Sequence, residues 1–110
     1  MGSDYTPAEV AALLAHGNVQ LIDVRTRPEH DAGRIDGDSW IELSELPAQA
    51  GSIGRDQPVI FYCRSGGRSA MATDAFRQAG YDAHNMTGGL LRWHAEGLPL
   101  EPADGRVADH

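Results

Sequence analysis

Short apolar runs alternate along the chain with stretches in which apolar residues recur at helical spacing. The clearest strand-like runs are Val19–Asp23, Ser39–Ile41, Val59–Tyr62 and Tyr81–Met86. Strands that alternate with helical segments favour a parallel sheet, because right-handed crossovers place the helices on both of its faces. The pattern therefore predicts an α/β domain of three layers (α/β/α) around a central five-stranded parallel sheet.

Start and stop signals delimit the helices between these runs. Thr6, Pro7 and Glu9 have the spacing of a capping box that opens a helix, and Gly17 ends it. Further helical segments are expected at Pro28–Ala32, at Ser44–Ala50, from near Ser69 to Ala79, and after Gly88-Gly89. In the last of these, the spacing of Leu90 and Trp93 is typical of a core stripe.

One strand ends at the only cysteine of the chain. Cys63 directly follows the apolar run Val59–Tyr62, and a loop rich in glycine and arginine, Arg64–Arg68, comes next. A parallel strand would bring Cys63 to the carboxyl edge of the sheet, where open α/β folds bind ligands. The loop can turn its backbone N–H groups inward and form an anion cradle around the sulfur. The nearby helix start and two arginines favour the thiolate, which is the nucleophilic form.

A second strand brings charged residues to the same edge. Asp23 and Arg25 follow the run that starts at Val19, so they lie near Cys63 if the two strands are parallel. Two interpretations stay open for this pair. Asp23 and Arg25 either touch the site directly, or they form buried charge pairs with Glu29 or another carboxylate that brace the loops.

Four segments in the same order resemble the signatures of the rhodanese family of sulfurtransferases. They are Leu21–Arg25 (LIDVR), Gly33–Gly37 (GRIDG), Cys63–Ser69 (CRSGGRS) and Gly88–Trp93 (GGLLRW), the last followed by Gly97-Leu98-Pro99. The resemblance covers most of the chain and implies the rhodanese fold. The chain departs from the family at Asp36, where a proline is usual, and at Asp38, where a small residue is usual.

The resemblance implies sulfur transfer through a Cys63 persulfide. The expected donor is thiosulfate or a related persulfide donor, and the expected acceptor is cyanide, a small thiol or a protein thiol. The implied donor-binding residues are Arg64, Ser65, Gly66, Gly67, Arg68 and Ser69. Tyrosine-phosphatase-type sites read C-x5-R, whereas Cys63 and Arg68 are one position closer together. A phosphatase or arsenate reductase relative, and a non-catalytic module that binds a partner protein, remain the alternatives.

Composition limits the classes of partner. The chain has 110 residues and a net charge of −7, which disfavours nucleic acid and anionic membranes. Histidines without ligand spacing and a single cysteine predict neither a metal site nor a disulfide. No cofactor is expected, and the cysteine usage favours the cytoplasm. We expect a single rhodanese domain over residues 4–100 and a flexible, polar C-terminal tail over residues 101–110.

Overall fold

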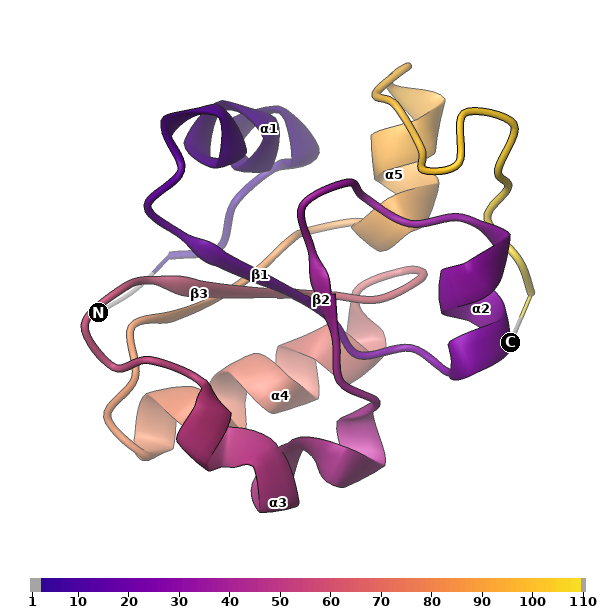
Figure 1. Cartoon of the computed structure of the whole chain (residues 1–110). Helices are drawn as coiled ribbons and strands as arrows, with labels where there is room; N and C mark the ends of the chain where they lie inside the picture. The colour runs from indigo at the N-terminus through magenta and orange to yellow at the C-terminus, as the bar shows by residue number, and fades with distance from the viewer. Residues whose placement is uncertain (1–2, 110) are drawn as a thin grey trace.

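The alternating patterns build one sheet with helices on both of its faces (Figure 1). The structure is a computed structural model that describes residues 3–109. Its strands are β1 (Gln20–Asp23), β2 (Ser39–Trp40), β3 (Val59–Tyr62) and β4 (Ala83–Asn85). Its helices are α1 (Pro7–His16), α2 (Arg27–Ala32), α3 (Leu46–Gln49), α4 (Gly67–Gln78) and α5 (Gly89–Ala95), with 3-10 turns η1 (Leu43–Glu45) and η2 (Ala50–Ser52).

The sheet is parallel throughout and has the order β2-β1-β3-β4. The predicted α/β/α arrangement is confirmed, but the expected five strands are wrong, since the described residues form four. In place of a fifth strand, Tyr5 makes a single parallel bridge to Met86. The pairing goes no further because Thr6 caps α1 and Pro7, which lacks a backbone N–H, begins it.

The two faces of β3 belong to two separate hydrophobic clusters. Val59 and Phe61 pack on one face with residues of α3 and α4, and Ile60 packs on the other with α1 and α5. This division follows from the period of two along a strand, because both faces of a central parallel strand are covered. Leu90 and Trp93 are buried in the second cluster, in line with the core stripe that their spacing indicates.

The segment after α5 returns along α2. The backbone groups of Glu101 pair with those of Arg34, and the N–H of Arg106 donates to the Ala32 carbonyl. These contacts do not test whether residues 101–110 are flexible, so the flexible tail stays a prediction. His110 lies outside the described residues. Over residues 3–109, none of the helices combines the length and apolar character that a transmembrane span requires.

Candidate active site

The carboxyl ends of β1 and β3 meet in the middle of the sheet. The chain leaves β1 towards β2 on one side and leaves β3 towards β4 on the other, so the sheet order reverses between these strands. Asp23 pairs with Tyr62 in the register of the two strands, which places Asp23 beside the residue before Cys63. Open α/β sheets form their ligand crevices at this kind of switch point.

The Cys63 side chain lies at the floor of the loop that follows β3. Its Sγ accepts a hydrogen bond from the Gly66 N–H at 3.1 Å and lies 3.3 Å from Ser69 Oγ. Gly66 is buried, with φ of +110°, a conformation that favours glycine, and α4 begins at the next residue. The turn therefore directs backbone donors of the loop towards the sulfur.

These donors shift the thiol towards its ionised form. Burial raises the pKa of the Cys63 thiol, and hydrogen bonds from the Ser69 hydroxyl and from the N–H groups of Ser69, Gly66 and Ser65 lower it. The hydrogen bonds outweigh burial, so the pKa lies below the ordinary value of 9.0. Since the thiolate is the nucleophilic form of cysteine, the loop activates Cys63.

The first turn of α5 holds the outer side of the loop. The Cys63 and Arg64 carbonyls accept hydrogen bonds from the N–H groups of Leu90 and Leu91, at 2.9 and 3.0 Å. Gly89 makes this approach possible: a Cβ there would lie 2.5 Å from the Arg64 carbonyl oxygen, and its φ is +61°. The helix α5 therefore satisfies the carbonyls of the first two loop residues.

Each loop arginine is engaged by a carboxylate from a distant part of the chain. Arg64 Nη2 lies 3.0 Å from Asp109 Oδ1, and Arg68 binds both oxygens of Glu29 at 2.8 and 2.9 Å. Both arginine side chains remain about a quarter exposed, at 26% and 27%. The exposed residues Ser65 and Gly67 complete the rim of the loop. The six predicted loop residues lie between Cys63 and the first turn of α4, and Gly66 and Ser69 contact the sulfur.

Glu29 is a buried acid that reaches the loop from α2. It also accepts hydrogen bonds from the backbone N–H and the hydroxyl of Thr26. Burial raises the pKa of Glu29, but the bonds from Arg68 and Thr26 outweigh burial and lower it from 4.5 to about 2. A carboxylate that stays ionised at this position holds Arg68 beside Cys63.

Asp23 and Arg25 pair with each other and not with Glu29. The guanidinium of Arg25 makes two bonds to the Asp23 carboxylate, at 2.8 and 2.7 Å, and a third bond to the Gly33 carbonyl. Both side chains are fully buried, and no hydrogen bond links either of them to Cys63 within residues 3–109. This geometry favours the bracing interpretation, in which the pair ties the end of β1 to the end of α2.

A second carboxylate shares this buried region. His30 Nδ1 lies 2.8 Å from Asp23 Oδ2 and 3.8 Å from Asp38 Oδ2, and the Tyr62 hydroxyl donates to Asp38 at 2.6 Å. Burial raises the pKa of Asp38 from 3.8 to about 6. Candidate ligand atoms of Asp23, His30 and Asp38 lie within 4.8 Å of one another. Because Arg25 already holds the Asp23 carboxylate, a cation would compete with the guanidinium, and we assign no metal.

Comparison with known proteins decides the family. The model of the rhodanese-like domain matches residues 6–96. The chain belongs to the rhodanese-like domain family. It is 35% identical over 89 residues to a sulfurtransferase of Allochromatium vinosum (80% of this chain, 83% of that protein). It is also 35% identical over 100 residues to the human thiosulfate:glutathione sulfurtransferase (77% of this chain, 87% of that protein).

Solved structures and longer relatives share the domain. A rhodanese-related protein of Thermoplasma volcanium superposes with a TM-score of 0.83 at 28% identity, covering 89% of this chain and 96% of that one. An HTH-type transcriptional regulator of Mycobacterium tuberculosis is 35% identical over 99 residues, which is 87% of this chain. The chain spans only 43% of that regulator. The rhodanese-like domain thus occurs in relatives of different length.

Two residues of this rhodanese-like domain that support the loop were not singled out as site residues from the sequence. Glu29 has a readable signal, because its spacing from Thr26 is that of a capping box. Asn85, at the end of β4, donates to the Gly66 carbonyl through Nδ2, and its Oδ1 accepts from the Ser69 hydroxyl at 2.6 Å. The Ser69 hydroxyl proton is thus shared between Asn85 Oδ1 and Cys63 Sγ. No local sequence signal identifies Asn85 as a site residue, because it reaches the cysteine loop only through the position of β4 next to β3 in the sheet.

Proposed function

We propose that this rhodanese-like domain is a sulfurtransferase that carries sulfane sulfur on Cys63. The observation that carries the proposal is the Cys63 Sγ, buried at the floor of a loop whose Gly66 N–H donates to it. Its pKa lies below the ordinary value, which favours the nucleophilic thiolate form. The relatives that are named sulfurtransferases support the reaction class.

In the first half-reaction, the Cys63 thiolate attacks the outer sulfur of thiosulfate. A bond forms between Sγ and that sulfur while the sulfur–sulfur bond of the donor breaks, and sulfite leaves with the bonding electron pair. Cys63 is left as a persulfide, and no external oxidant or reductant is consumed. The name of the human relative supports thiosulfate as the donor, and a related persulfide donor would react in the same way.

The loop supplies the electrostatic part of this step. Arg64 offers its guanidinium to the anionic oxygens of the donor. Arg68, which Glu29 binds through both oxygens, adds positive charge at the same loop. The N–H groups of Ser65, Gly66 and Ser69, which lower the pKa of the thiol, also stabilise the anion of the persulfide. Asp23 and Arg25 act behind the loop by bracing it, without touching the sulfur.

In the second half-reaction, a thiophilic acceptor takes the terminal sulfur. Cyanide, a small thiol or a protein thiol attacks that sulfur, the persulfide bond breaks, and the Cys63 thiolate returns. Because the donor product leaves before the acceptor reacts, ping-pong kinetics are expected.

The test is thiosulfate:cyanide sulfurtransfer by the wild type and by Cys63→Ser. We expect thiocyanate from the wild type alone, and an intact mass that rises by one sulfur atom after thiosulfate is added without acceptor. Activity that persists in Cys63→Ser would overturn the mechanism. Turnover of p-nitrophenyl phosphate without turnover of thiosulfate would instead favour a phosphatase, and inertness towards both would favour a binding module.

A further inference from the structure

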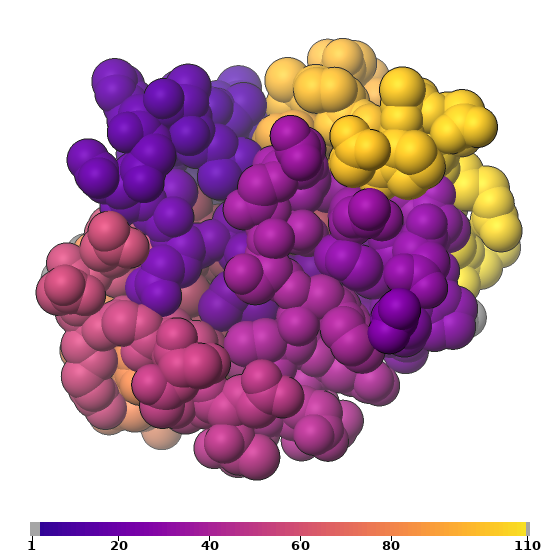
Figure 2. Space-filling model, in the orientation of Figure 1, coloured from indigo at the N-terminus to yellow at the C-terminus, as the bar shows by residue number. Residues whose placement is uncertain are grey.

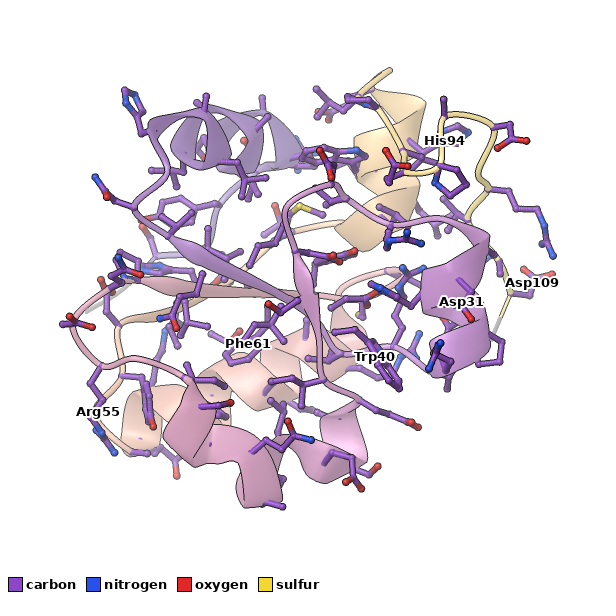
Figure 3. All side chains as sticks on the ribbon, in the orientation of Figure 1. Asp31, Trp40, Arg55, Phe61, His94 and Asp109 are labelled. Carbon is purple, nitrogen blue, oxygen red and sulfur yellow. The ribbon has the colours of Figure 1, made fainter. Side chains whose placement is uncertain are left out.

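A carboxylate from the end of the described chain lies at the mouth of the cysteine loop. Asp109 Oδ1 is 3.0 Å from Arg64 Nη2, and 45 residues separate the two in the sequence. Figure 3 shows Asp109 beyond α2, at the margin of the molecule. The Asp109 side chain is 94% exposed, whereas that of Arg64 is 26% exposed. A water-exposed anion thus faces a largely covered loop cation.

The residues before Asp109 pack against the domain. Ala108 is buried, and Val107 packs against the cluster that contains Ile60 and Leu90. The Arg106 N–H donates to the Ala32 carbonyl at 2.9 Å, and a Cβ at Gly33 would lie 2.3 Å from the Arg106 carbonyl oxygen. In Figure 2 the yellow atoms near the C-terminus lie beside the violet surface around α2. These contacts place Asp109 next to Arg64, so the ion pair orders only the one residue beyond Ala108.

Arg64 has one N–H that the ion pair with Asp109 does not use. Its Nε is buried and has no hydrogen-bond partner within residues 3–109. Arg68, the other loop cation, is held on both sides of its fork by Glu29. The two loop arginines thus differ. Arg64 has a buried N–H without a partner, and its carboxylate partner, Asp109, is exposed to water.

We propose that Asp109 is a specificity-determining residue that competes with anionic donors for Arg64. The proposal rests on the proposed function, in which Arg64 binds donor oxygens. Thiosulfate carries two negative charges, so it must displace or repel the Asp109 carboxylate to reach Arg64. A donor with little charge meets no such competition, and Asp109 therefore shifts the preference of the loop away from small dianions.

The magnitude follows from the exposure of the pair. Exposed ion pairs are weak, so removing the Asp109 charge should strengthen thiosulfate binding by about two- to fivefold. The same interaction is screened by salt, with a Debye length of about 10 Å at 0.1 M. The gain should therefore shrink towards unity when the ionic strength is raised to about 1 M.

The test measures binding of thiosulfate without chemistry. In a Cys63→Ala background, the dissociation constant of thiosulfate is obtained by NMR titration of the backbone amides of residues 64–69, with and without Asp109→Asn. Asp104→Asn is the matched control, because Asp104 is exposed in the same segment and forms no ion pair within residues 3–109. Arg64→Gln, alone and with Asp109→Asn, closes a double-mutant cycle.

We expect tighter binding for Asp109→Asn, no change for Asp104→Asn, and no effect of Asp109→Asn once Arg64 is glutamine. Equal affinities with and without Asp109→Asn would overturn the proposal, as would a gain that survives Arg64→Gln or an absence of measurable binding in every variant. The proposed function fails separately, if the wild type forms no persulfide with thiosulfate. The competition for Arg64 would still stand in that case, because the titration needs no sulfur transfer.

Discussion

Replacing Glu29 by glutamine tests how α2 holds the cysteine loop. The Glu29 side chain is 2% exposed and binds Arg68 through both oxygens. Its pKa is about 2 in the folded chain, below the 4.5 of a free side chain. Because the folded-state pKa is the lower one, the stabilisation is complete above pH 4.5 and is lost as the pH falls towards 2.

The magnitude follows from these two pKa values. The difference between 4.5 and about 2 corresponds to about 3 kcal/mol at roughly 1.4 kcal/mol per pKa unit. Arg68 is about a quarter exposed, so water screens part of this interaction. We therefore expect Glu29→Gln to lower the free energy of unfolding at pH 7 by about 2 to 3 kcal/mol.

Urea denaturation at pH 7 and at pH 3 measures the effect. The wild type should lose stability between these values, and Glu29→Gln should lose less, because the glutamine does not titrate. Asp31→Asn in the same helix is the control, since its ion pair with Arg27 is exposed and contributes less than about 1 kcal/mol. If Glu29→Gln unfolds within about 0.5 kcal/mol of the wild type at pH 7, the Arg68 pair contributes little and the reasoning is wrong.

Three further substitutions probe the network, the nucleophile and the loop support. Burial raises the Asp38 pKa to about 6, so wild-type stability should fall as the pH rises from about 4 to 6. Asp38→Asn should remove this dependence of stability on pH and raise the free energy of unfolding by about 2 kcal/mol at pH 7.5, as measured by thermal or urea unfolding. If the stability of Asp38→Asn changes with pH as that of the wild type does, the prediction is wrong. Ser69→Ala should raise the pKa of Cys63, measured from the thiolate absorbance as a function of pH, and should slow sulfur transfer about tenfold. If the Cys63 pKa is the same in Ser69→Ala and the wild type, the hydroxyl does not stabilise the thiolate. Gly89→Ala should lower the free energy of unfolding by about 2 to 3 kcal/mol, whereas Gly51→Ala, where a Cβ meets no atom within 4 Å, should leave it almost unchanged. Equal unfolding midpoints for the two variants would contradict the close packing at Gly89.

Local signals predicted most of the fold. The capping box at Thr6 and Glu9 is present, α1 ends where Gly17 was expected to stop it, and the apolar run Val59–Tyr62 is β3. The expected count of five strands was wrong, because the described residues form four strands and Tyr5 adds only a single bridge to Met86 before α1 begins. The alternation of strands and helices predicted that the strands are parallel. It did not predict their order in the sheet, because that order depends on tertiary packing.

The site was predictable where its parts are neighbours in the sequence. The cysteine, its glycines and its arginines lie within one turn, and the position of Asp23 and Arg25 at the end of β1 followed from the parallel strands. The pairing of Asp23 with Arg25 was not predicted, although a spacing of two positions suits it. The partners of the arginines were not predictable, because Glu29 and Asp109 lie far from the loop in sequence. A charge pattern alone does not tell which of sixteen acidic residues meets which guanidinium.

The lengths of the outer strands affect how this domain behaves at high concentration. The border strands are β2, with two residues, and β4, with three, and Tyr5 and Asp4 already bond to the outer backbone of β4 around Asn85. Little unpaired main chain is therefore available to recruit a strand from another molecule. The longer strands, which carry the most apolar sequence, are enclosed between neighbours, so edge-to-edge aggregation would first require the sheet to open.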